Sequence, residues 1–265
     1  MEFLENLWSY IWGLLNTGFG TALIGAFAGA AGANWFASKK EQTRALAHEV
    51  RATNSATQLA AAIANHSLGF KDQIGKQTIT QYFCDRDRYI HFLEDAKLGR
   101  KPGEKFHVEY TFGNLKSFEH NSSKLVELVL HEISDAPEIG TIALHLEQTL
   151  NSFDHVMALR NAELVRLEAL KGEKNDDEFA HIYFGIETND GLIDERLKTA
   201  MEGFRSLLED IIFFSIKLSE KTCVYATAKS KKFGKRKSLK ATTVNFGGVD
   251  KSLLPDKNNY PDFNF

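Results

Sequence analysis

The longest run without a charged side chain lies near the N-terminus, over residues 11–37. It exceeds the roughly 20 residues that a helix needs to cross a bilayer core, and Trp12 and Trp35 lie near its ends. Lys39 and Lys40 follow, and the positive-inside rule then assigns the C-terminal side to the cytoplasm. We therefore expect a single transmembrane helix over 11–37 with the N-terminus outside. A buried helix of a globular protein is the alternative.

Small residues recur within this run at a heptad spacing. They are separated by alternating steps of four and three: Gly18, Ala22, Gly25, Gly29 and Gly32. Such stripes let helix backbones approach closely, and the heptad period favours a left-handed crossing. We expect the five residues to mediate homo-oligomerisation, and any pore would need a ring of chains. The alternative is that glycine and alanine are common in membrane helices.

The rest of the chain shows mainly helical periodicity. We expect a mainly α fold, in which the transmembrane helix precedes a cytoplasmic helical bundle with minor β structure. The expected segments are an interfacial or extracytoplasmic N-terminus (1–10), a helical stalk (38–73), the bundle (74–250) and a partly ordered tail (251–265). Within the bundle, the pattern predicts helices over 77–97, 122–133, 136–170 and 192–218 and a short strand or extended segment over 105–112. Residues 223–246 suggest a small hairpin or a loose tail.

The composition and the known sequence motifs indicate no metal-binding or cofactor-binding site. The 265 residues carry a formal net charge of −3 and two cysteines, Cys84 and Cys223, whose spacing matches no metal site. The chain contains no phosphate-binding loop, dinucleotide-binding glycine motif, zinc-protease motif or calcium-binding loop. We therefore expect no metal and no cofactor.

One pattern has a catalytic interpretation. Arg86 and His91 form an R-x4-H motif, in which histidine could move protons while arginine stabilises a pentacoordinate phosphate. The motif resembles the signature of the HEPN helical ribonucleases, where arginine and histidine from two protomers converge at a dimer interface. The alternative is a charged helix face with Arg86, Asp87 and Arg88 in ion pairs.

A cluster of basic residues lies near the C-terminus. Its members are Lys229, Lys231, Lys232, Lys235, Arg236, Lys237 and Lys240. Such a cluster could bind RNA, a nucleotide signal, anionic lipid headgroups or an acidic neighbouring subunit. A solvated hairpin tip is the alternative.

The uncharged run and the R-x4-H motif together resemble the membrane accessory proteins of bacterial antiphage systems, such as those of type VI CRISPR loci. The resemblance covers the anchor and residues 86–91 only. It implies a homo-oligomeric inner-membrane protein of antiviral defence that perturbs membrane permeability when its cytoplasmic domain is triggered. The implied partners are the lipid bilayer, further copies of the chain, and RNA, a nucleotide signal or a cytosolic defence protein at the basic cluster. The alternatives are a membrane-tethered HEPN-like ribonuclease and a non-catalytic membrane scaffold for a cytosolic partner.

Overall fold

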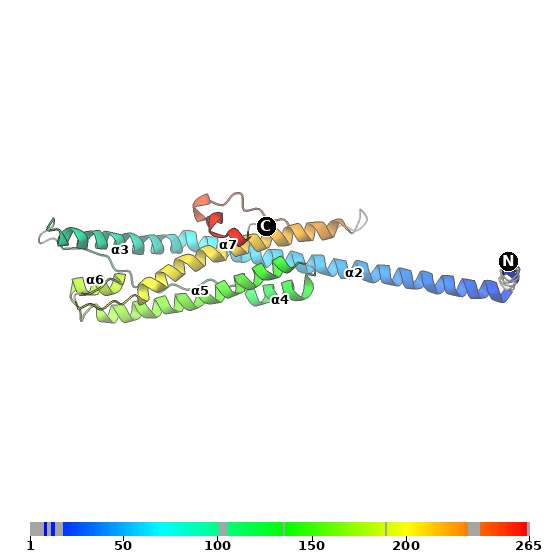
Figure 1. Cartoon of the computed structure of the whole chain (residues 1–265), viewed down its shortest axis with the longest axis horizontal. Helices are drawn as coiled ribbons and strands as arrows, with labels where there is room; N and C mark the ends of the chain where they lie inside the picture. Colours follow the sequence, from blue (N-terminus) through cyan, green and yellow to red (C-terminus); the bar gives the residue numbers. More distant parts are fainter. Residues whose placement is uncertain are drawn as a thin grey trace.

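A long helical rod forms one side of the molecule. The computed structural model describes residues 8–9, 12–13, 18–100, 105–134, 136–188, 190–232 and 239–263. Helix α2 (Gly18–Phe70) has 53 residues, passes through the π-helical turn η1 (Lys71–Gly75) and continues as α3 (Lys76–Lys97). Because no proline occurs between residues 18 and 97, every amide in the rod can donate a backbone hydrogen bond. Figure 1 shows that the N-terminal part of α2 projects beyond the other helices.

Four further helices pack along this rod. They are α4 (Ser122–Glu132), α5 (Pro137–Leu170), α6 (Asp176–Phe184) and α7 (Arg196–Lys231). Helix α5 runs in the same direction as the rod, and α7 returns antiparallel to both (Figure 1). Helices α4 and α7 each pack on both α2 and α5. The chain is therefore mainly helical, with α7 at the centre of the bundle.

Small side chains occupy the contact between α2 and α7. The buried residues in this region include Thr53, Ala56, Thr57 and Ala60 of α2, and Ser215, Ser219, Thr222 and Ala226 of α7. The hydroxyl of Thr57 donates to that of Thr222 at 2.9 Å, and the Thr222 hydroxyl also donates to the Leu218 carbonyl. These short side chains satisfy their hydroxyls locally and let the two helices approach closely.

Aromatic rings fill the middle of the bundle. Phe70 of α2, Phe153 of α5 and Phe204 of α7 have ring centroids 5.8 to 6.0 Å apart, and Phe118 contacts the first two. Phe153 and Phe204 are fully buried. Edge-to-face and tilted ring pairs add to the stabilisation from burying their apolar area.

The segment before α4 is extended but has no partner strand. Residues 105–121 form neither a helix nor a strand, and over 105–112 every second side chain is partly buried. Tyr110 and Phe112, for example, pack on Phe179 and Tyr183 of α6. The period-2 pattern thus correctly predicted an extended segment. Because no strand occurs among the described residues, the expected minor β structure is wrong. The expected hairpin is also wrong over 223–231, which continue α7.

The C-terminal segment, 239–263, lies against α7 and η1. Buried Lys71 of η1 donates to the Leu253 carbonyl at 2.9 Å and pairs with Glu209 of α7 at 2.5 Å. The ring of Tyr260 stacks on Phe213 with centroids 3.7 Å apart, and its hydroxyl donates to Asp210. Three short 3-10 turns, Lys251–Leu253, Lys257–Asn259 and Pro261–Phe263, provide the bends that follow the helix surface.

The expected transmembrane helix over 11–37 is not supported. Among the described residues, no helix combines the length and the apolar character needed to cross a membrane. The run lacks charge, but 11 of the 16 residues from 18 to 33 are glycine or alanine, whose small side chains contribute little hydropathy. The expectations of a membrane protein, a pore and a single-pass inner-membrane location are therefore contradicted.

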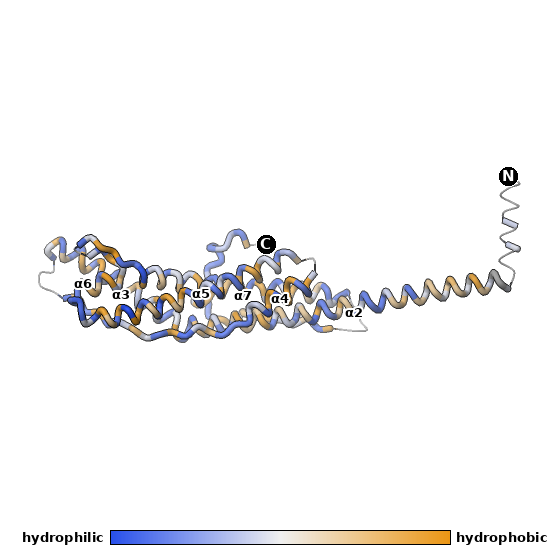
Figure 2. Tube along the Cα trace, turned by 90° about the horizontal axis from the view of Figure 1, so that it is seen from below, coloured by the Kyte–Doolittle hydropathy of each residue, from blue (hydrophilic) through white to orange (hydrophobic). Residues whose placement is uncertain are grey.

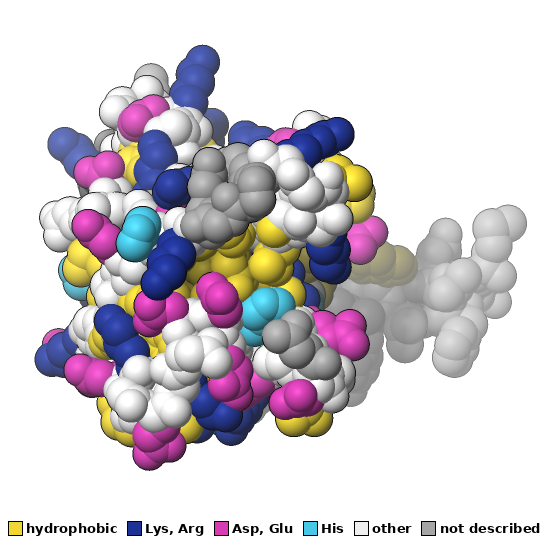
Figure 3. All heavy atoms as spheres, turned by 90° about the vertical axis from the view of Figure 1, so that its left-hand side faces the viewer, with side chains coloured by type: hydrophobic (Ala, Val, Ile, Leu, Met, Phe, Trp, Pro, Cys, Tyr) yellow, Lys and Arg dark blue, Asp and Glu magenta, His cyan; other side chains and the backbone are white. Residues whose placement is uncertain are grey.

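The far end of the bundle carries an apolar surface among charged side chains. Figure 3 views this end, where α3, α5 and α6 end, and shows hydrophobic side chains at the centre with acidic and basic side chains around them. In the last turns of α3, Tyr89 and Phe92 pack with Phe106 of the following segment, with centroid distances of 5.0 to 6.4 Å. The aromatic packing of the core thus continues to the end of the rod.

Two neighbouring leucines of α5 test the position of the core. Leu146 is fully buried, whereas Leu144 is 47% exposed. We expect Leu146→Ala to lower the free energy of unfolding by about 2–5 kcal/mol, because it removes buried methyl groups and leaves a cavity. The matched change Leu144→Ala should alter it by less than about 0.5 kcal/mol. Denaturant unfolding measures both, and equal effects would contradict the assigned helix face.

Candidate functional site

The R-x4-H motif lies on α3, with its two residues on different faces. Five helical positions separate Arg86 from His91 by about 140° around the axis. Arg86 Nε donates to the Phe184 carbonyl at 3.0 Å, while His91 is exposed and pairs with Glu94 at 3.4 Å. The structure does not bring the two side chains together within one chain. Their catalytic role stays a prediction.

The basic cluster is divided between paired and exposed residues. Lys229 is paired with Glu49 on α2, at 2.9 and 3.1 Å to the two carboxylate oxygens. Lys231, Lys232 and Lys240 are exposed. The remaining members lie outside the described residues: Lys235, Arg236 and Lys237. Among the described residues of the basic cluster, Lys229 therefore has a structural role, because it pairs with Glu49 and connects α7 to α2.

The small-residue stripe lies on the arm, which we define as residues 18–41 of α2. The arm is about 36 Å long at the helical rise of 1.5 Å per residue. A Cβ atom added at Gly18, Gly25, Gly29 or Gly32 would meet no atom within 4 Å. Figure 2 shows that the arm is neutral to hydrophobic (white to orange) toward its N-terminal end and hydrophilic (blue) near the bundle. The stripe is therefore open along its length.

Large apolar side chains on the arm are also exposed. The exposed fractions are 48% for Leu23, 70% for Phe27, 57% for Trp35 and 68% for Phe36. Residues 18–38 contain no charged side chain. Contiguous exposed apolar surface of this kind usually marks an interaction site.

A polar cluster fixes α2 where the arm meets the bundle. Glu49 accepts hydrogen bonds from the hydroxyls of Ser134 and Tyr225 at 2.6 and 2.5 Å, and it pairs with Lys229. Burial raises the pKa of Glu49, but hydrogen bonds from Ser134, Tyr225 and Lys229 outweigh this effect and lower the pKa to about 2. The cluster links α2, α7 and the α4–α5 connection, so it sets the direction in which the arm leaves.

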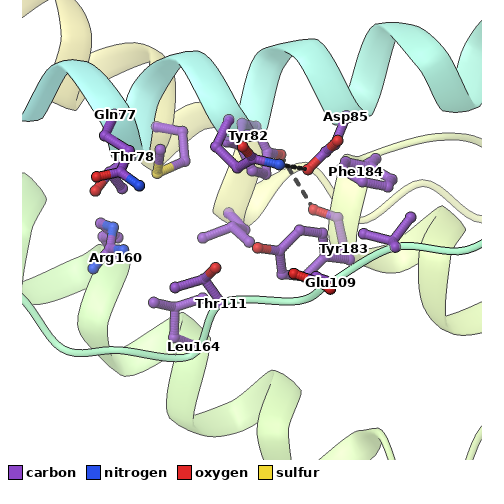
Figure 4. Close-up of a pocket in the computed structure, with 14 residues that line it drawn as sticks. Gln77, Thr78, Tyr82, Asp85, Glu109, Thr111, Arg160, Leu164, Tyr183 and Phe184 are labelled. Atoms are coloured by element: carbon purple, nitrogen blue, oxygen red, sulfur yellow. Dashed lines mark hydrogen bonds between the residues drawn. The ribbon is translucent and has the colours of Figure 1, made fainter.

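A second feature is a cavity of about 250 Å³ between α3, α5, α6, α7 and the extended segment. Polar residues of α3 form one wall, including Gln77, Thr78, Gln81, Tyr82 and Asp85. Tyr82 donates to the Tyr183 carbonyl at 3.2 Å, and Asp85 accepts from Gln81 and Arg88. Figure 4 shows Gln77 and Thr78 of α3 on one side of the cavity and Arg160, Thr111 and Leu164 on the other.

Arg160 is the cationic side chain among the residues that line this cavity. It is 2% exposed, and its Nη1 donates to the Gly113 carbonyl and to Asn161 Oδ1 at 3.2 and 3.0 Å. Its Nε has no hydrogen-bond partner, and no described Asp or Glu pairs with it. Burial lowers the pKa of Arg160, yet an arginine remains charged in proteins.

Sequence reasoning missed Arg160, although the pattern of α5 contains a signal. Arg160 lies three residues after Met157 and four before Leu164, both of which are buried. It therefore occupies a position of the apolar stripe where the 3.6-residue period predicts a hydrophobic side chain. A charged residue at such a position is a candidate for a buried functional group.

Comparisons with known proteins give no further assignment. Searches against protein-family models, curated protein sequences and solved structures found no significant match. The resemblance to antiphage membrane proteins and HEPN ribonucleases thus stays a prediction. The arguments below depend on the geometry of this chain.

The Glu49 cluster gives a pH-dependent prediction. Because the folded-state pKa is about 2 and the ordinary value is 4.5, the stabilisation is complete above pH 4.5 and is lost as the pH falls toward 2. We expect Glu49→Gln to lower the free energy of unfolding at pH 7 by about 1–2 kcal/mol, after allowance for solvent screening. The difference from the unmodified chain should shrink between about pH 4.5 and 2.

Glu138→Gln is the matched control. Glu138 of α5 pairs with Lys221 of α7 at 3.1 Å, but its side chain is 54% exposed. This variant should change the free energy of unfolding by less than about 0.5 kcal/mol. Denaturant unfolding at several pH values measures both variants. A Glu49→Gln effect as small as that of Glu138→Gln would contradict the structural role of the cluster.

Proposed function

We propose that this protein is a self-assembling scaffold, in which the arms of several copies pack together and the helical bundles project from the joint. The observation that carries the proposal is the exposed arm, which has no charged side chain over residues 18–38. Its glycine stripe is open, and its large apolar side chains Leu23, Phe27, Trp35 and Phe36 are exposed. A second copy of the arm has the same small-residue stripe and therefore the complementary surface.

The energetics of a solitary helix support this proposal. An isolated helix is marginal in water, and each glycine destabilises it by roughly 1 kcal/mol relative to alanine. The arm has five glycines between residues 18 and 32. Packing against other arms would offset this cost, because buried apolar surface contributes about 25 cal/mol per Å².

The distribution of residues around the arm favours more than two copies. Phe36 continues the spacing of the stripe, four residues after Gly32. At about 100° per residue, Leu23 and Phe27 lie on the side opposite the stripe. A simple pair of arms would leave these two side chains exposed, whereas a bundle of several arms would cover both faces.

Assembly through the arm would bring several identical bundles into one particle. Because linked copies bind a multivalent partner with much higher avidity than a single copy does, such an arrangement suits a scaffold. The exposed lysines at the C-terminal end of α7 would be repeated in each copy. Packing of the arms would thus allow the protein to act as a scaffold, a role that needs no catalytic group.

The glycine stripe provides the test. We expect Gly25→Leu/Gly29→Leu to weaken self-association at least tenfold, because two leucines prevent the close approach of the backbones. Leucine has a higher helix propensity than glycine, so the loss cannot come from an unfolded arm. Analytical ultracentrifugation of the full chain over a range of concentrations measures the association.

Ala31→Leu/Ser38→Leu is the matched control, since both positions lie away from the stripe. It adds two leucines to the face that carries Leu23 and Phe27, so it should not weaken association, because the stripe stays open and larger apolar side chains add buried area on that face. The proposal fails if the unmodified chain is monomeric at all concentrations. It also fails if the glycine variant assembles normally, or if the arm binds only lipid vesicles.

A further inference from the structure

We infer that the cavity around Arg160 is a binding site for a small organic carboxylate. The inference is independent of the arm, since the cavity lies between α3, α5, α6 and α7. It rests on a buried guanidinium whose Nε has no partner, on the cavity that this group lines, and on the charges of the other lining residues.

A purely structural role explains Arg160 poorly. A buried charge is strongly unfavourable unless it is paired, and no described carboxylate forms an ion pair with Arg160. The hydrogen bond from Nη1 to the Gly113 carbonyl helps to hold the extended segment. Asn161 already performs this task, because it donates to the Leu115 carbonyl and accepts from the Leu115 amide.

The free edge of the guanidinium matches a carboxylate. Nη1 is occupied by Gly113 and Asn161, which leaves the edge that contains Nε. Two parallel N–H groups on one edge of an arginine bind the two oxygens of a carboxylate. Figure 4 shows the Arg160 side chain extending from α5 toward Gln77 and Thr78 of α3, across the cavity. These two side chains offer further donors to the same anion.

The charges of the cavity select against phosphate. Asp85 and Glu109 line the same cavity as Arg160, and the buried Asp85 already accepts hydrogen bonds from Gln81 and Arg88. Arg88 pairs with Asp85 at 3.1 Å, so Arg160 is left to balance one negative charge of a ligand, whereas the second charge of a phosphate dianion would be unbalanced and repelled by Glu109. A carboxylate with one negative charge is the better match.

The walls define the size and character of the rest of the ligand. The volume of about 250 Å³ lies below the range of drug-sized pockets. Leu164, Leu197 and Met201 supply apolar contacts, and Phe184 adds an aromatic face. We therefore expect a small carboxylate with a compact apolar body.

Calorimetric titration and thermal unfolding of the full chain test the inference. The probes are acetate, butyrate, benzoate and phenylacetate, with inorganic phosphate and butylammonium as chemical controls. We expect saturable binding of at least one of the larger carboxylates, with a rise in melting temperature that increases with its concentration. A panel in which no carboxylate binds, or in which phosphate binds as well as the best carboxylate, would overturn it.

Variants of Arg160 separate ligand binding from structure. Arg160→Met should weaken binding of the best carboxylate at least tenfold, and without ligand it should melt at the same or a higher temperature, because it removes an unpaired buried charge. Arg160→Lys should also weaken binding, since lysine lacks the planar pair of donors. A melting temperature several degrees lower in Arg160→Met, with binding retained in Arg160→Lys, would identify Arg160 as a structural group.

Two further variants complete the test. Thr78→Phe fills the α3 side of the cavity and keeps the arginine at position 160, so it should abolish binding even if the arginine variants do not fold. Arg166→Met is the matched control, because Arg166 lies on the same helix but is paired with Glu163 and Asp194. It should bind the carboxylate like the unmodified chain. Equal losses in Arg166→Met and Arg160→Met would overturn the assignment.

Discussion

The close contact between α2 and α7 determines the arrangement of the other elements. Its buried residues are small, and the hydrogen bond between Thr57 and Thr222 lies within it. Helix α5 then packs on α7, and the aromatic rings of Phe70, Phe153 and Phe204 fill the space where the three helices meet. Because small side chains permit close approach, larger residues along this contact would separate α2 from α7 and open the aromatic core.

The same contact explains why the arm has a defined direction. Helix α2 is held along α7 up to the Glu49 cluster, where Lys229, Tyr225 and Ser134 converge on one carboxylate. Over the arm, residues 18–41, no described element covers α2, and the helix continues without a break. A rigid helix anchored at one end keeps its exposed stripe in a fixed orientation relative to the bundle. Such preorganisation reduces the entropy lost when arms associate.

Much of the fold could be predicted from the sequence, but the two most informative sites could not. The periodicity of 77–97 and 136–170 correctly predicts α3 and α5, whose bounds differ by one residue. The end of α7 was missed because Ser219 and Thr222 read as loop residues, although their hydroxyls donate to carbonyls within the helix. Arg160 was missed because a single charged residue within an apolar stripe does not change the prediction of an amphipathic helix. Only the tertiary structure shows that it is buried beside a cavity.

The arm illustrates the difference between an uncharged segment and an apolar one. Its sequence predicts a membrane helix because it lacks charge over 18–38, yet most of the residues in that stretch are glycine and alanine. Transfer of such small side chains into hydrocarbon gains little free energy, since the gain scales with apolar area. Their advantage is the close contact of helix backbones, which increases as side chains become smaller. The composition that makes the arm a poor membrane span is therefore the composition that helix–helix packing requires.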